Sequence, residues 1–167
     1  MRTPICAAVA FAASAMLLGF NCAASADDRE TCKTESGDAA IEACTKAIDS
    51  KKYLKQKRAL SVLYTNRGVE YEKKQDFDHA IADHDQAIKT DPKNPLAFNN
   101  RGNAYAAKGD FEHAITDYDQ AVKLNPKYAE AFYNRGLAKR KKSDWTGGDA
   151  DIAQAKELQP GIGGAGN

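Results

Sequence analysis

Residues 98–105 read FNNRGNAY, and the same pattern recurs as YTNRGVEY at 64–71 and FYNRGLAK at 132–139, a step of 34 residues each time. The same register holds for Phe77, Phe111 and Trp145, and for Pro92, Pro126 and Pro160. A fixed period of this length is typical of a solenoid, in which each unit packs mainly on its neighbours and the stack presents one long curved face. The sequence therefore favours a binding scaffold over an enzyme.

Each unit divides into two helical patterns. In the second unit, Phe98, Gly102 and Tyr105 share one face of a helix predicted over 97–108. Gly109 breaks this helix, and Asp110 can cap a second helix predicted over 111–124, which ends before Asn125-Pro126 because proline disfavours helical backbone in the preceding residue. The glycine inside each first helix predicts a close approach between the two helices of a unit.

This pattern resembles the tetratricopeptide repeat (TPR) family. The residues that match it are Phe98, Gly102, Tyr105, Ala114, Tyr118, Ala121 and Pro126, whereas Arg101 stands where the family usually has leucine. The resemblance implies an all-α fold, an α-solenoid of antiparallel helix pairs with units at 61–94, 95–128 and 129–160. The third unit departs from the pattern at Lys139 and Gly148, as a terminal repeat is expected to do.

The N-terminal residues predict export and processing, and the C-terminal residues predict a disordered tail. Residues 1–26 have the layout of a secretory signal peptide, with an apolar run and an Ala24-Ser25-Ala26 cleavage signal. A retained membrane anchor and a lipoprotein at Cys22 are the alternatives. Cleavage removes the apolar run, so we expect no membrane span to remain. It also removes Arg2, which leaves 23 basic residues against 23 acidic ones, and this balance predicts no long-range attraction to nucleic acid. We expect a periplasmic or secreted protein whose glycine-rich tail, 161–167, is disordered.

Residues 27–60 are predicted to form a divergent helical hairpin and a connector. The hairpin has helices at 28–35 and 38–49, and its pair Ala40-Ile41 matches Ala80-Ile81 of the first unit. The mature chain has two cysteines, Cys32 and Cys44, which in an exported protein are expected to form a disulfide. Two free buried thiols and a metal site remain as alternatives, although two cysteines without a nearby histidine make a poor zinc site.

The resemblance also implies where a partner binds. In this family the first helices line the concave face, which holds a protein or an extended peptide. By position, the groove residues are Asn66, Val69, Lys73, Asn99, Asn100, Asn103, Tyr133, Asn134, Leu137, Arg140 and Lys141, with Thr65 and Ala107 beside them. One asparagine per unit can hold a peptide backbone, because its amide both donates and accepts hydrogen bonds; the alternative is that it pairs with the neighbouring helix.

A carboxylate clamp, as found in relatives that bind chaperone tails, is not predicted. Asn103 and Asn134 match its central asparagines, but Asn99 stands where a lysine is required and no further unit supplies the last two cations. Arg140, Lys141 and Lys142 still make one end of the groove basic, which favours an acidic peptide unless they are only a solvated charge run.

Three arginines are predicted to be structural. Arg67, Arg101 and Arg135 each lie 16 residues before an aspartate, namely Asp83, Asp117 and Asp151. We expect each arginine to form an ion pair with an aspartate of its own unit or the next, in place of the usual leucine contact.

Catalytic chemistry is not indicated by the sequence. His79 and Asp83 are four residues apart, but no third metal ligand joins them, and no phosphate-binding loop or nucleophile motif occurs. The sequence thus predicts a scaffold or assembly factor that binds a protein or peptide, without a cofactor, metal or catalytic residue. The alternative is a self-association module that forms a homo-oligomer through the ends of the solenoid.

Overall fold

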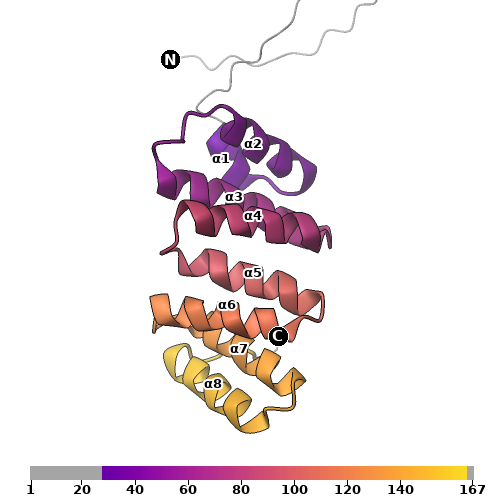
Figure 1. Ribbon diagram of the computed structural model, residues 1–167, viewed down its shortest axis with the longest axis vertical. Coiled ribbons are helices and arrows are strands. Elements are labelled where there is room, and N and C mark those ends of the chain that lie inside the picture. The colour runs from indigo at the N-terminus through magenta and orange to yellow at the C-terminus, as the bar shows by residue number, and fades with distance from the viewer. Residues whose placement is uncertain (1–27, 165–167) are drawn as a thin grey trace, which may run out of the picture.

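The computed structural model describes residues 28–164, and eight helices make up its regular structure (Figure 1). They are α1 (Asp28–Thr34), α2 (Gly37–Asp49), α3 (Lys57–Lys73), α4 (Phe77–Thr90), α5 (Pro95–Ala107), α6 (Phe111–Leu124), α7 (Ala129–Lys141) and α8 (Trp145–Leu158). The helices stack in chain order into one column, from α1 and α2 at one end to α8 at the other. This confirms the predicted all-α solenoid. The signal peptide predicted over 1–26 lies outside the described residues, as do 165–167.

The second helix of every unit begins at the same aspartate position. The side chains of Asp76, Asp110 and Asp144 accept hydrogen bonds from backbone N–H groups three residues later, which satisfies donors that a helix start otherwise leaves unpaired. In the first two units that later residue is a histidine, whose ring also bonds the aspartate and stacks on the tyrosine of the first helix. His79 therefore belongs to a helix cap.

The mid-helix glycines allow the close packing that their positions predict. A Cβ atom on Gly102 would lie 2.7 Å from the ring of Tyr118, and one on Gly68 would lie 2.6 Å from the ring of His84. In the third unit the backbones themselves come together, because a Cβ on Gly136 would lie 2.7 Å from the carbonyl oxygen of Gly148. Each unit therefore needs glycine where its first helix crosses its second.

A ladder of arginines joins successive units. Arg101 donates two hydrogen bonds from Nε and Nη2 to Asp117 of its own unit, at 2.8 and 2.6 Å, and one from Nη1 to Asp85 of the preceding unit, at 2.6 Å. Arg135 repeats this with Asp151 and Asp119. The first unit pairs Arg67 with Asp83 and with the Thr45 hydroxyl, again reaching backwards along the chain. The third contact of each arginine is thus with the preceding unit rather than the next.

A disulfide closes the N-terminal hairpin, and a hydrogen bond and a shared core join the hairpin to the repeats. A disulfide links Cys32 of α1 to Cys44 of α2, and both residues are buried. The N–H of Gly37, at the start of α2, donates to a carboxylate oxygen of the buried Glu70 on α3, at 2.7 Å. Tyr53 of the connector also enters this core. Helix α3 begins at Lys57, about one turn before the predicted unit boundary, and so it packs against the hairpin.

Two further features concern the turn after α8 and the character of the described helices. Gly161 to Gly164 form a turn after α8, and a Cβ on Gly163 would lie 2.4 Å from the ring of Tyr133, so this turn packs directly on α7. Between residues 28 and 164, no helix has both the length and the apolar character needed to cross a membrane.

Candidate binding groove

One face of the first helices α3, α5 and α7 forms a continuous surface, which we call the groove face. Residues spaced by four, three and four lie along the same side of a helix. The groove face consists of Val62, Asn66, Val69 and Lys73 on α3, Leu96, Asn100, Asn103 and Ala107 on α5, and Glu130, Asn134, Leu137 and Lys141 on α7. Because α3 contacts α5 and α5 contacts α7, the three rows lie side by side.

The sequence prediction missed two apolar members of the groove face. Val62 is 38% exposed and Leu96 is 45% exposed, although both are large apolar residues in ordered helices. Each lies two residues before the aromatic position of its unit, so their equal place in the 34-residue period was the available signal. With Leu137, the groove face thus offers one exposed aliphatic residue in each unit.

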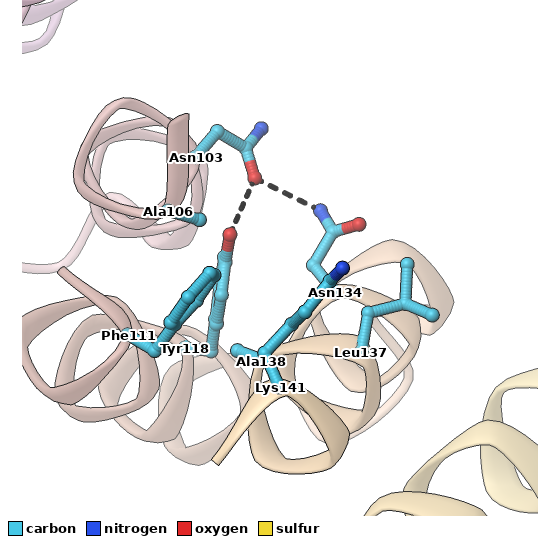
Figure 2. A pocket seen from close by; sticks show the side chains of 8 residues that line it. All are labelled: Asn103, Ala106, Phe111, Tyr118, Asn134, Leu137, Ala138 and Lys141. Atoms are coloured by element: carbon cyan, nitrogen blue, oxygen red, sulfur yellow. Dashed lines mark hydrogen bonds between the residues drawn. The ribbon is translucent and has the colours of Figure 1, made fainter. Parts of the chain in front are cut away.

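A hollow of about 250 Å³ opens at the centre of the groove face (Figure 2). Its floor is apolar and comes from Ala106 of α5, Phe111 and Tyr118 of α6, and Ala138 of α7, and its rim is formed by Asn103, Asn134, Leu137 and Lys141. We call it the central hollow. The floor residues from α6 were not predicted, because helix periodicity places the second helices behind the groove and does not show that a side chain reaches between two first helices.

Hydrogen bonds fix the amide groups at the rim of the central hollow. The Tyr118 hydroxyl donates to Oδ1 of Asn103 at 2.8 Å, and Nδ2 of Asn134 donates to the same oxygen at 3.0 Å. Burial, together with the charge of Glu72, raises the pKa of Tyr118 well above its usual range, so its hydroxyl remains a donor. Within residues 28–164, the Nδ2 group of Asn103 and the Oδ1 atom of Asn134 form no hydrogen bond, so both can bind a ligand.

The predicted asparagine set divides into structural and exposed members. Asn99 is only 2% exposed and bonds Asn100 and Asn134, so its prediction as a groove residue is wrong: it lies in the contact between α5 and α7. Thr65 is also 2% exposed and bonds the Ser61 carbonyl within its own helix. Asn100 is 8% exposed, which leaves only its edge accessible. The asparagines therefore both bind the neighbouring helix and face the groove.

A second hollow, of about 220 Å³, lies at the N-terminal end of the groove face. It is lined by Cys32, Lys33 and Glu35 on one side and by Asn66, Val69, Glu70 and Lys73 on the other. Helix α1 thus forms one wall, and the groove residues of α3 form the opposite wall. Lys73 is held 2.5 Å from Glu70, so its charge is already matched within the protein.

A third hollow, of about 290 Å³, lies at the C-terminal end of the groove face and is mostly apolar. It is lined by Leu137, Arg140, Lys141 and Trp145. Trp145 is 57% exposed, and the guanidinium carbon of Arg140 lies 5.3 Å from the centre of its ring, a cation–π contact. Tyr133 lies apart from these hollows, under the turn at Gly163.

Comparison with known proteins shows that the chain is similar to tetratricopeptide repeat proteins. A family model for the TPR repeat matches residues 68–109 and, one unit later, residues 102–142. The first TPR of Spaghetti (RPAP3), solved bound to the HSP90 peptide SRMEEVD, is 30% identical over 60% of this chain and 79% of that chain, with a TM-score of 0.59. No curated protein sequence matches the chain.

Two other solved structures are similar in fold. The second TPR domain of human RPAP3, in complex with the HSP70 peptide SGPTIEEVD, is 29% identical, covers 60% of this chain and 84% of that chain, and has a TM-score of 0.58. MamA is 20% identical and has a TM-score of 0.65 over 75% of this chain and 70% of that chain. The likeness to MamA concerns the fold alone.

Proposed function

Because this chain belongs to the tetratricopeptide repeat family, we propose that it is a protein-binding scaffold that holds an extended segment of a partner along its groove face. The observation that carries this proposal is the groove face itself, where aliphatic side chains are exposed in every unit beside amide groups with unused hydrogen-bonding atoms. Exposed apolar surface that is rimmed by polar groups is typical of binding sites for proteins and other ligands.

The chemistry of the groove suits an extended peptide. An extended backbone carries unpaired N–H and C=O groups, which the amides of Asn66, Asn103 and Asn134 can bind without regard to sequence. The three hollows then receive side chains, which is how an extended ligand gains specificity. The peptides bound by the RPAP3 domains, SRMEEVD and SGPTIEEVD, are short segments of the size that such a groove would hold.

The proposed activity is holding or assembling a partner, without catalysis. Its place is outside the cytoplasm, in the periplasm or the medium, which is supported by the signal-peptide layout of residues 1–26 and by the Cys32–Cys44 disulfide, a bond typical of oxidising compartments. Self-association through the ends of the solenoid remains the competing proposal, and the same experiment separates the two.

The experiment compares two matched leucine substitutions in the mature chain. Leu96 is exposed on the groove face, and Leu54 is exposed on the connector and lines none of the three hollows. Leu96→Glu is expected to abolish capture of the partner from an extracytoplasmic extract, whereas Leu54→Glu is expected to leave capture unchanged. Circular dichroism verifies that both variants fold, and light scattering reports the oligomeric state.

The proposal fails if partner capture survives Leu96→Glu at the wild-type level. It also fails if the wild-type chain captures no extracytoplasmic protein and is instead a stable dimer. That second outcome would favour self-association through the solenoid ends.

A further inference from the structure

The basic residues at the end of α7, Lys139 to Lys142, differ in whether they already form an ion pair within the protein. Lys139 lies 2.8 Å from Asp151, and Lys142 forms an ion pair with Glu112 of the preceding unit. Arg140 lies 3.6 Å from Asp149 and against the ring of Trp145. Among residues 28–164, no acidic side chain forms an ion pair with Lys141, although it is exposed.

Lys141 also occupies a special place on the groove face. It lines the central hollow and the C-terminal hollow, and so does Leu137. These two residues, four apart on α7, therefore form a ridge between two neighbouring apolar hollows. Figure 2 shows Lys141 and Leu137 on the α7 side of the central hollow, with Asn103 facing them from α5.

We propose that these two hollows take an internal acidic segment of the partner, with a large apolar side chain in the central hollow and an adjacent aspartate or glutamate paired with Lys141. This inference rests on the proposed function and specifies its ligand. The unused Nδ2 group of Asn103 provides a second donor for the peptide beside that carboxylate. The C-terminal hollow, with Trp145, then receives a second apolar side chain.

The apolar part of the proposal follows from the lining of the central hollow. Its floor is made of alanine methyl groups and two aromatic rings, which offer no partner to a charged group. The one polar group of the floor, the Tyr118 hydroxyl, already donates its hydrogen bond to Asn103 at the rim. A buried charge without a partner is costly, whereas an aliphatic or aromatic side chain gains free energy when it leaves water.

The acidic part follows from the contrast between Lys141 and its neighbours. Lysines 139 and 142 stabilise contacts between helices, so a ligand would have to break an ion pair to use them. Lys141 can bind a carboxylate at no such cost. The carboxylate belongs to a side chain rather than to the end of the peptide, because a chain that stopped at Lys141 would leave the C-terminal hollow empty.

The test selects peptides from a displayed library of random twelve-residue segments whose C-termini are fused to the carrier, so that only side chains supply carboxylates. Selection on the mature chain is expected to enrich sequences with a large apolar residue within two positions of aspartate or glutamate. The same selection is made on Lys141→Glu and on Lys123→Glu. Lys123 lies on α6, is exposed and lines none of the hollows, so its variant carries the same change of charge as a control.

The affinities of the selected peptides then separate the contribution of the Lys141 charge from that of apolar packing in the central hollow. Lys141→Glu is expected to weaken binding by about tenfold or more, because it replaces an attractive charge pair with a repulsive one, and Lys123→Glu by less than about twofold. Added salt should weaken binding to the wild type and not to the Lys141→Glu variant. Ala106→Leu, which fills part of the floor of the central hollow, should weaken binding independently of salt.

The outcomes distinguish this inference from the proposed function. A selection that enriches no peptide contradicts the proposed function. Enriched peptides without the apolar–acidic pairing overturn only the inference, as do acidic peptides that bind Lys141→Glu as tightly as the wild type. A requirement for a free C-terminal carboxylate, found with synthetic peptides, would also overturn it.

Discussion

Arg101 illustrates how this solenoid replaces an apolar contact with a polar one. Its guanidinium group reaches two carboxylates on two successive second helices and lies 5.8 Å from the centre of the Phe98 ring. The hydrogen bonds that Arg101 donates to Asp117 outweigh the effect of burial and raise the pKa of Arg101 further above its usual range. The planar fork fixes the relative orientation of three helices, which a leucine side chain in the same place would not do.

Removing this cross-link should cost more than removing an exposed lysine. Arg101→Ala leaves Asp117, which is 3% exposed, without its partner. Because the Arg101 side chain is 22% exposed, the expected loss is about 2 kcal/mol, below that of a fully buried pair, and the melting temperature should fall by roughly 6 °C. Lys108→Ala removes only the exposed pair with Asp78 and should change the melting temperature by about 1–2 °C. Equal losses in calorimetry would contradict this role.

Asp151 links the stability of the third unit to pH. Burial opposes its ionisation, but hydrogen bonds and charges from Arg135 and Lys139 outweigh burial and lower its pKa in the folded state. A lowered folded pKa contributes stability above the unfolded value, about 3.9, and that stability is lost as the pH falls through the folded pKa. Asp151→Asn should therefore be less stable than the wild type at pH 7.

The pH dependence provides the measurement and its control. Urea unfolding of both proteins from pH 7 to pH 2.5 should show the difference shrinking once the pH falls below about 4. A difference that stays constant over this range would mean that the loss comes from packing rather than from charge.

Residue-level prediction succeeded where the period itself carried the information. The spacing of 16 residues paired each arginine with the correct aspartate, because equal spacing in three units repeats one geometry three times. It could not assign Asn99, since a single helix pattern does not show where the next unit crosses it. For the same reason it missed that the Tyr118 hydroxyl fixes Asn103 at the groove.

At the scale of single helices, α1 is the most dependent on its neighbours. It has seven residues, and Cys32 is its one buried residue. A helix this short is not stable alone in water, so the disulfide to α2 and the contact with α3 hold it in place. Helix α1 is also one wall of the N-terminal hollow, and therefore the disulfide shapes the groove as well as the fold.

Loss of the disulfide should release α1 selectively. The Cys32→Ser, Cys44→Ser double variant is expected to lose about 3 kcal/mol of stability in the hairpin, the amount that closing so short a loop contributes in the chain-entropy model. Hydrogen exchange measured by mass spectrometry should accelerate in α1 and at the start of α2. Exchange in α5 to α8 should be unchanged, and acceleration there would show that the hairpin supports the whole stack.

Helix boundaries were predictable to within about a turn for physical reasons that differ along the chain. The second helix of unit two matches the prediction at both ends, because Asp110 caps it and Pro126 follows it. Helix α3 starts earlier than predicted since its first turn packs against the hairpin, a contact that the repeat pattern does not contain. Helix α8 has two glycines, Gly147 and Gly148, in its first turn, yet it begins at Trp145, where Asp144 caps it.

At the scale of the molecule, each helix contacts only helices one or two places away in the chain. Stability in such a stack is close to a sum of unit and interface contributions, so the ends should open before the middle. Native-state hydrogen exchange in low urea is expected to give the greatest protection in α4 to α6 and less in α1 and α8. A single common opening free energy for all eight helices would contradict this gradient.

From the sequence, the shape of the whole molecule could be predicted well, whereas the nature of its ligand could not. A period of 34 residues determines helix pairing and stacking, because every unit must bury the same faces against the same neighbours. It does not determine the groove chemistry, which depends on residues outside the period, such as Ala106, Leu137 and Lys141. Those positions vary between units, and their neighbours became known only when the helices were placed in space.

The neighbour-only contacts also affect how the chain reaches its fold. Contacts close in sequence cost little loop-closure entropy, so helical stacks of this kind have low contact order and fold in microseconds to milliseconds. A chain that emerges N-terminus first can therefore form each helix pair as soon as that pair is exposed, beginning with the hairpin that contains Cys32 and Cys44. Each newly formed pair would then serve as the template for the next, and the groove would grow in the same direction as the emerging polypeptide.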